Sequence, residues 1–269
     1  MSAPCITFGE FAALCRRLDV GAIEIRNDLR GVEIEDGASA AAIKAAAAEN
    51  GLTILSINAL QRFDLFDATR ASEALALAQY AAACGAQALV LCPTNSRRDE
   101  RAAAERHANL TAALKHLKSI LEDHGLVGLI EPLGFEECAL RRKSDAVKAI
   151  YDAAGERHFQ LVHDTFHHHL SGEDIFYPDL TGLVHVSGVE DRELSVDRMR
   201  DGHRVLVGAA DRLDNIGQLN TLFARGYRGH VSFEPFSDVI AQAADIETRL
   251  RESIAYLRAN VGAGQLNAA

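Results

Sequence analysis

Short apolar runs alternate with longer amphipathic segments along nearly the whole chain. Residues 88–92 form an apolar run that ends at Pro93, and residues 126–130 form another that follows Gly125. Continuous apolar runs of this kind are typical of parallel strands buried on both faces. The runs that predict strands are 6–8, 21–26, 52–58, 88–92, 126–130, 159–163, 181–186 and 229–233.

The segments between these runs have helical periodicity and end in residues that stop helices. Ser39 can cap an Ala-rich helix that ends near Asn50-Gly51, and Gly85 follows the helical segment 68–84. The helix after 159–163 is weak, and the stretch 187–208 is polar. The predicted helices are 10–18, 39–50, 68–84, 98–124, 144–154, 216–224 and 240–259.

Eight strand–helix alternations without a Pro/Gly/Ser-rich linker predict a single (β/α)₈ TIM barrel over residues 1–260, followed by a flexible tail at 261–269. A doubly wound Rossmann-type sheet is the competing architecture. It would be favoured by a Gly-x-Gly-x-x-Gly turn after a strand or by a Walker-type Gly-Lys-Ser/Thr, and the sequence contains neither.

The composition of the chain argues against nucleic acid and membranes as binding partners. The formal net charge of -10 disfavours nucleic acid, whose binding depends on Lys and Arg neutralising phosphates. The five cysteines include no Cys-x-x-Cys pair, which fits reduced thiols. We find no signal peptide and no uncharged apolar run of about 18 residues, so we expect a cytoplasmic protein with no membrane partner. Assembly into a homo-oligomer is compatible with the sequence.

Four potential metal ligands come at the ends of separate strand-like runs. Glu131 follows 126–130, Asp164 follows 159–163, His185 lies within 181–186, and Glu234 follows 229–233. The carboxyl ends of barrel strands share one rim, so these side chains should converge. Two Glu, one Asp and one His form a mainly oxygen ligand set for one divalent ion; we expect Mn²⁺, and Zn²⁺, Co²⁺ or Mg²⁺ would also suit it.

Each of these residues taken alone has a simpler explanation. Glu131 could be a loop carboxylate and His185 a hydrogen-bonded core histidine; their joint placement is what favours a metal site. His167, three residues after Asp164, could reach a substrate oxygen beside the ion, or it could serve packing alone.

The ligand set predicts enediolate chemistry on a small polyhydroxy ketone. A divalent ion bound by a carbonyl and the neighbouring hydroxyl acidifies the C–H between them and stabilises the enediolate that follows. A carboxylate must remove that proton and a second group must return one. Glu131 and Glu234 are the candidates for this acid/base pair, while Asp164 and His185 would mainly hold the ion.

The chain resembles the xylose isomerase-like TIM-barrel superfamily and, within it, the inosose (2-keto-myo-inositol) isomerase branch of inositol catabolism. The resemblance covers nearly the whole chain. It implies that Glu131, Asp164, His185 and Glu234 bind one divalent ion, and that His167, Arg204 and Asn58 contact the substrate. The segments that carry it are 23–26, 55–60, Glu131 with Cys138, 164–169, 184–186, 190–191, 204–205 and 231–234.

The sequence departs from this branch at positions that bear on the substrate. Ser187-Gly188 replace an acidic residue common shortly after the metal-binding His, and Leu206-Val207-Gly208 stand where Trp-Pro-Gly is expected. Glu137 resembles a substrate-contacting Glu of the ketose 3-epimerases, where the inosose branch tends to have an amide. A ketose 3-epimerase or a hydroxypyruvate-type isomerase is therefore the nearest alternative.

Two more distant alternatives use the same barrel. An endonuclease-like phosphodiesterase would need a multinuclear metal cluster and a basic DNA-binding face, and both the acidic charge and the lack of further strand-end His and Asp ligands in the first half of the chain speak against it. A non-catalytic sugar-binding barrel would lack an acid/base Glu, whereas Glu131 and Glu234 are both present.

Overall fold

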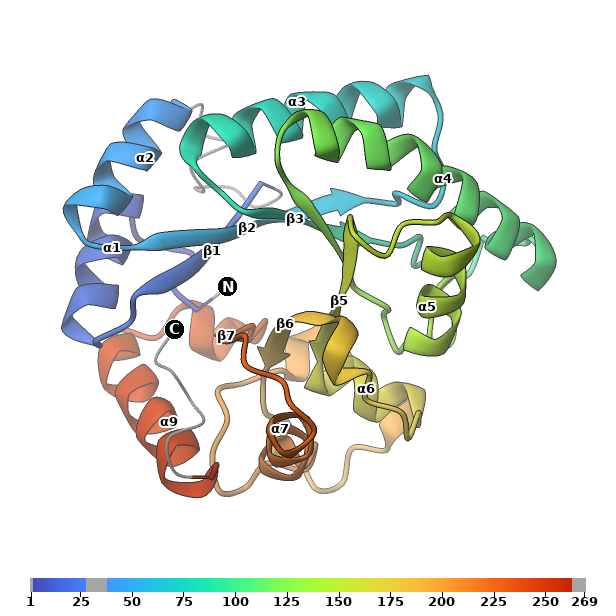
Figure 1. The fold of residues 1–269 in the computed structure, drawn as a ribbon. Coiled ribbons are helices and arrows are strands. Elements are labelled where there is room, and N and C mark those ends of the chain that lie inside the picture. Colours follow the sequence, from blue (N-terminus) through green and yellow to red (C-terminus); the bar gives the residue numbers. More distant parts are fainter. Residues whose placement is uncertain (1, 28–37, 263–269) are drawn as a thin grey trace.

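The computed structural model describes residues 2–27 and 38–262, which form a parallel β-barrel surrounded by helices (Figure 1). The seven strands of this part of the chain pair in sequence order, each parallel to the next. They are β1 (Ala22–Arg26), β2 (Thr53–Gln61), β3 (Ala88–Cys92), β4 (Val127–Ile130), β5 (Phe159–Asp164), β6 (Thr181–Val186) and β7 (His230–Phe233).

The helices follow the strands around the outside of the barrel. Caps define several of them: Ser39 and Asp67 accept hydrogen bonds at the starts of α2 and α3, and Gly85 ends α3 in the left-handed conformation that glycine favours. The helices are α1 (Phe8–Arg17), α2 (Ala40–Glu49), α3 (Ala68–Cys84), α4 (Ala103–Asp123), α5 (Lys143–Asp152), α6 (Thr165–Ser171), α7 (Asn215–Ala224), α8 (Asp238–Ala241) and α9 (Ile246–Asn260).

The apolar core has two main layers, inside and outside the barrel. The outer layer packs the helices against strand residues such as Leu89 and Leu91. The inner layer contains the alternate strand residues, among them Val90 and Val162. All five residues of β3 are buried, which is why this strand reads as a continuous apolar run.

The expectation of a strand at residues 6–8 is wrong. Phe8 is the first residue of α1, and Thr7 caps this helix in a reciprocal capping box with Glu10. The apolar run 6–8 therefore leads into the first turn of α1, and it pairs with no strand. Sheet pairing among the described residues runs from β1 to β7 without joining these two edges.

Side chains bridge the space between the edge strands β1 and β7. Arg26 Nη1 donates to Glu234 Oε1 at 2.9 Å, and the Ser2 hydroxyl donates to the carbonyl oxygen of Phe233 at 3.3 Å. A cavity of about 140 Å³ lies here, lined by the N-terminal residues, α1, both strands and α9. Leu14 and Leu18 pack against Leu250 and so fix α1 beside α9.

Smaller differences from the expected pattern concern helix ends. The expected helix 240–259 is split into α8 and α9, and α4 begins at Ala103 instead of residue 98. The polar stretch after β6 contains two 3₁₀ helices, η2 (Val196–Arg198) and η3 (Asp201–His203). Most of the expected tail, 263–269, lies outside the described residues. None of the described helices is long and apolar enough to span a membrane.

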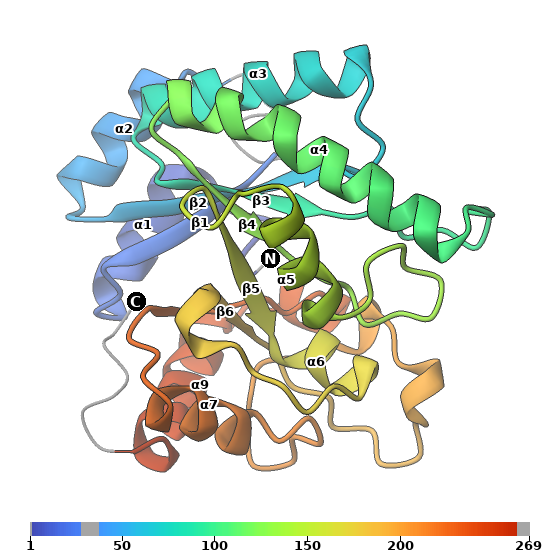
Figure 2. The same cartoon turned by 45° about the vertical axis from the view of Figure 1, so that its right-hand side comes forward.

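The loops that follow the strands gather at one end of the barrel. Figure 2 shows β5 running directly into α6, with the long segment after β6 on the same side. Gly188 and Val205 pair as an isolated antiparallel bridge, which folds this segment back toward the strand ends. The candidate site lies at this end.

Candidate metal centre

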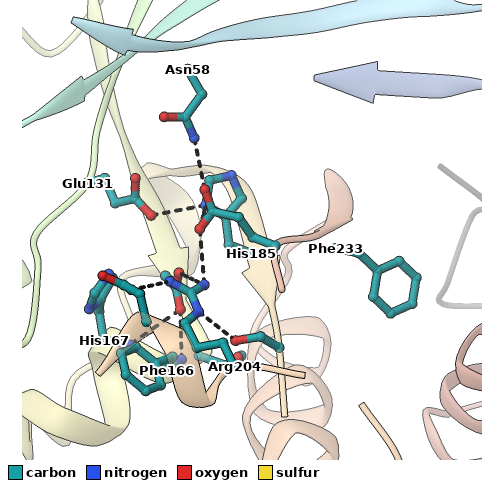
Figure 3. A network of polar contacts seen from close by, with 12 residues as sticks. Asn58, Glu131, Phe166, His167, His185, Arg204 and Phe233 are labelled. Atoms are coloured by element: carbon teal, nitrogen blue, oxygen red, sulfur yellow. Dashed lines mark hydrogen bonds and ion pairs between the residues drawn. The ribbon is translucent and has the colours of Figure 1, made fainter. Parts of the chain in front are cut away.

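The four expected ligands converge at the carboxyl ends of neighbouring strands. Glu131 follows β4, Asp164 ends β5, His185 lies in β6 and Glu234 follows β7. One ligand atom from each lies within 4.8 Å of the others, and all four residues are buried. Figure 3 shows Glu131 and His185 facing each other, whereas the ring of Phe233 points away, as alternation along a strand requires.

His185 lies among carboxylates on both sides of its ring. Its Nδ1 is 3.0 Å from Glu131 Oε1 and 3.3 Å from Glu234 Oε2, and its Nε2 is 2.9 Å from Glu24 Oε1. Burial alone would lower the pKa of His185, but the charges of Glu24, Glu234 and Glu131 raise it well above its ordinary value. Without a metal ion, His185 therefore provides part of the positive charge that this cluster needs.

Arg204 adds a further positive charge to the cluster. Its Nη2 donates to Asp164 Oδ2 at 2.5 Å and to Glu234 Oε2 at 3.0 Å. The guanidinium is buried between the rings of Phe166 and Phe236, with centroid distances of 4.9 and 4.8 Å. Arg204 is thus close to two expected ligands, and its expected substrate contact stays a prediction.

The departure at Ser187 is explained by its contact with Arg204. The Arg204 Nε donates to the Ser187 hydroxyl at 2.9 Å, while Asn215 donates to the Ser187 carbonyl oxygen at 2.8 Å. A serine here orients the guanidinium without adding a further buried carboxylate. The residue therefore contributes to the site through Arg204.

The carboxylates differ in their electrostatic surroundings. Burial and the charge of Glu234 raise the pKa of Glu131 above its usual value. Burial raises the pKa of Asp164 to about 6, against the effect of Arg204. For Glu234 the charges of His185 and Arg204 outweigh burial and hold the pKa well below its usual value. Glu131 and Asp164 are thus harder to ionise than usual, whereas Glu234 is ionised more easily.

These residues fit a divalent metal ion. Three buried carboxylates that repel one another gain from a shared cation, and three oxygens with one imidazole nitrogen suit Mn²⁺, Zn²⁺ or a similar ion. Within residues 2–27 and 38–262, this is the one group of at least three His, Cys, Asp or Glu side chains whose ligand atoms converge in this way.

Two buried polar atoms beside the cluster have no partner within the described chain. They are Asn58 Oδ1 and His167 Nδ1. Asn58 Nδ2 donates to Glu234 Oε1 at 3.0 Å, and a bulge at Ala59 in β2 accompanies this orientation. Burial and the Arg204 charge lower the pKa of His167 to about 4, so its ring is neutral at pH 7. Both atoms are available to a substrate hydroxyl.

Glu137 is not part of this cluster. Its carboxylate is 3.8 Å from the exposed Arg97 in the neighbouring loop. Its expected substrate contact, drawn from the resemblance to ketose 3-epimerases, stays a prediction.

Sequence reasoning did not assign Glu24 or Arg26 to the site. Both lie on β1, alternating with the buried residues Ile23 and Ile25, and their side chains reach His185 and Glu234. The signal was a charged residue at every second position of a strand, on the face that turns into the barrel.

Comparisons with known proteins agree with this fold. Residues 12–260 match the family model described as xylose isomerase-like TIM barrel. A xylose isomerase domain-containing protein from Salmonella typhimurium LT2 is 32% identical over 95% of this chain and 94% of its own, with a TM-score of 0.87. No curated protein sequence matches the chain.

Two other solved structures share the fold at lower identity. An IolI protein with a bound zinc atom is 20% identical over 96% of this chain and 95% of its own, with a TM-score of 0.83. A D-psicose 3-epimerase with D-tagatose from Clostridium cellulolyticum H10 is 15% identical over 97% and 96%, with a TM-score of 0.75. The chain belongs to the xylose isomerase-like TIM barrel family.

Proposed function

We propose that this protein is a divalent-metal-dependent isomerase that moves a carbonyl between adjacent carbons of a polyhydroxy ketone through an enediolate. The observation that carries the proposal is the buried cluster of Glu131, Asp164, His185 and Glu234 at the carboxyl end of the barrel. The zinc in the IolI relative and the ketose in the epimerase relative support the same class of cofactor and substrate.

The four clustered side chains would hold the ion, with Mn²⁺ as the first choice. When bound, the ion supplies a Lewis acid that polarises the substrate carbonyl and stabilises negative charge on the neighbouring oxygens. Asp164 and His185 act mainly as ligands. Asp164 is well fixed for this because its Oδ1 also accepts the backbone N–H groups of Phe166 and His167 at 2.7 and 3.3 Å.

Glu131 and Glu234 are the proposed acid/base pair. One carboxylate removes the proton from the hydroxyl-bearing carbon next to the carbonyl, and the other returns a proton to the former carbonyl carbon. The hydroxyl proton passes to the former carbonyl oxygen, so the carbonyl moves by one carbon and the atoms balance. Both contact His185, but their surroundings differ because Glu234 also accepts from Arg26, Asn58 and Arg204. Different environments for two carboxylates are what opposite proton-transfer roles require.

His167, Arg204 and Asn58 orient the substrate. The neutral His167 ring and the free oxygen of Asn58 can bind hydroxyl groups, since each has a buried atom that lacks a partner in the described chain. The Arg204 guanidinium is positioned to stabilise developing negative charge. These groups surround a substrate with several vicinal oxygens.

We propose 2-keto-myo-inositol as the substrate. Support comes from the sequence resemblance at Asn58 and at the Asp164–His167 run, together with the burial of both. A ketose 3-epimerase is the second candidate, and Glu137 is the residue that favours it. Its position beside Arg97, away from the ligand cluster, gives it no direct role in holding the ion.

The decisive experiment follows isotope exchange in D₂O. Protein freed of metal with a chelator is incubated with Mn²⁺, Zn²⁺, Co²⁺ or Mg²⁺ and with 2-keto-myo-inositol, fructose, tagatose or hydroxypyruvate. NMR should show an isomeric inosose with deuterium at the former carbonyl carbon, only when an ion is present. Full activity without metal would contradict the metal dependence, and a kcat/KM at least about ten times higher for an open-chain ketose would assign the other substrate.

A further inference from the structure

Glu24 is a largely buried carboxylate to which the proposed reaction gives no role. It comes from β1, and its side chain is 10% exposed. Its Oε1 lies 2.9 Å from His185 Nε2, on the opposite side of the imidazole from the ligand cluster. It therefore contacts a proposed ligand without being part of the cluster.

Two hydroxyl groups hold this carboxylate in place. Ser56 Oγ on β2 donates to Glu24 Oε2 at 2.5 Å, and the Ser232 hydroxyl on β7 also bonds to Glu24. These donors come from the two strands beside β1: β2, which pairs with β1, and β7, which faces its unpaired edge. The position of Glu24 is thus determined by three strands of the barrel.

The hydrogen bond from His185 determines which ring nitrogen carries a proton. An ionised carboxylate can only accept, so the Nε2 atom facing Glu24 must donate. In the neutral imidazole the lone pair is then on Nδ1. That atom faces Glu131 Oε1 at 3.0 Å and Glu234 Oε2 at 3.3 Å, inside the cluster.

We propose that Glu24 is a positioning residue that keeps His185 in the Nε2–H tautomer and presents Nδ1 to the divalent ion. This rests on the proposed metal-dependent function. Partners of this kind behind a metal-bound histidine fix its orientation and increase its basicity, and their loss typically weakens metal binding by about 10- to 100-fold.

Replacing Glu24 with Gln separates this role from a purely structural one. The side chain keeps its shape and can still accept from Ser56, so packing between the strands is preserved. Its amide NH₂ can also donate to Nε2, which stabilises the opposite tautomer and removes the lone pair from Nδ1. A role limited to filling space would leave both the tautomer and the metal affinity unchanged.

The test uses the full chain, with the metal ion itself as the probe. Calorimetry gives the Kd of the metal-free protein for Zn²⁺ and Mn²⁺, and long-range ¹H–¹⁵N spectra of the Zn²⁺ form report the His185 tautomer. Glu24→Gln should weaken binding by about 10- to 100-fold. Glu122→Gln, an exposed substitution on α4, is the matched control and should leave the Kd unchanged.

The wild-type spectrum should show zinc on Nδ1 and a proton on Nε2 of His185. Zinc on Nε2, or a Kd for Glu24→Gln equal to that of wild type, would overturn the inference while leaving the metal-dependent function intact. Failure of the wild-type protein to bind any of the ions would overturn both. If Glu24→Gln does not fold, the wild-type spectrum alone decides.

Discussion

At the scale of single residues, the site is a balance of buried charges. Asp164, Glu131 and Glu234 face His185 and Arg204, with Arg26 at the rim. Buried charges are tolerated only when they are paired and hydrogen-bonded, so a change to any member affects its neighbours. We expect substitution of the carboxylates Glu131 and Glu234 to lower kcat, and substitution of Arg204 to lower the stability of the fold.

Substituting Glu131 or Glu234 with Gln should lower kcat by more than about 100-fold, because each residue is both a ligand and a proton-transfer group in the proposed reaction. Steady-state kinetics at saturating Mn²⁺ provide the measurement. Glu122→Gln serves as the control on the far surface. A variant at either site with a kcat near that of wild type would remove that residue from the mechanism.

Arg204→Ala should destabilise the metal-free protein by about 3–5 kcal/mol, because Asp164 and Glu234 lose the buried partner that they share. A bound ion should reduce this loss by restoring positive charge. Chemical denaturation with and without Mn²⁺ measures both effects. Arg198→Ala, at an exposed position of η2, is the control. Equal stability of Arg204→Ala and wild type without metal would contradict the charge balance.

At the scale of elements, local sequence determines where α1 begins, and tertiary packing determines what α5 contacts. Thr7 and Glu10 begin α1 through a capping box, although the run 6–8 is β-prone. Behind β5, Lys143 Nζ contacts His163 Nδ1 at 2.9 Å and His168 Nδ1 at 2.8 Å. This second contact connects the first residue of α5 to α6, which carries His167.

Thr7→Val distinguishes a helix cap from a strand. A β-branched apolar residue would favour a strand, whereas loss of the capping hydroxyl should destabilise the protein by about 1 kcal/mol. The free energy of unfolding from urea titrations is the measurement, and Thr7→Ser should retain most of the stability. A gain in stability for Thr7→Val would mean that residues 6–8 behave as a strand.

Lys143 should make stability depend on pH. Burial lowers its pKa from 10.5 to about 7, with Glu173 opposing the shift. Between these values the unfolded chain keeps a proton that the folded protein has lost, so this group raises the free energy of unfolding by about 1.4 kcal/mol per pH unit. Below pH about 7 both states are protonated and its contribution is constant.

Lys143→Met lacks this titration, so the stability of wild type relative to the variant should increase as the pH is raised from about 7 to about 9.5. Denaturant titrations of both proteins at the two pH values measure the change. Lys148→Met, at an exposed position of the same helix, should show a difference that varies little with pH. A constant difference for Lys143→Met would contradict a depressed pKa at this position.

At the scale of the whole molecule, folding is what brings the proposed metal ligands together. The ligands extend from Glu131 to Glu234 along the chain and meet only when β4 to β7 are paired. An ion that binds the folded state alone stabilises it by about 2.7 kcal/mol at a hundred times its Kd. Metal binding and stability should therefore be linked.

The midpoint of thermal unfolding should rise when Mn²⁺ or Zn²⁺ is added to metal-free protein, and a chelator should reverse the rise. Differential scanning calorimetry over a series of ion concentrations is suitable, with Ca²⁺ as an ion of different size and preferred coordination. The Asp164→Ala variant should show no such rise. A midpoint that is independent of every ion would argue against a site on the folded protein.

The sequence by itself determined the parallel α/β architecture and indicated that Glu131, Asp164, His185 and Glu234 converge. Residues 68–84 and 88–92 match α3 and β3 because helix capping and continuous burial leave local signals. Their convergence could be predicted because parallel barrel strands bring their carboxyl ends to one rim whatever the length of the connections.

Only the tertiary structure decided how the barrel closes and what surrounds the ligands. Because Thr7 caps α1 and residues 6–8 form no strand, β1 and β7 remain the two edges of the sheet. The side chains of Glu24 and Arg26 point into the barrel, where they contact His185 and Glu234. Local periodicity tells which face a residue lies on. Its partner depends on strand tilt and register, which are set by contacts between segments far apart in sequence.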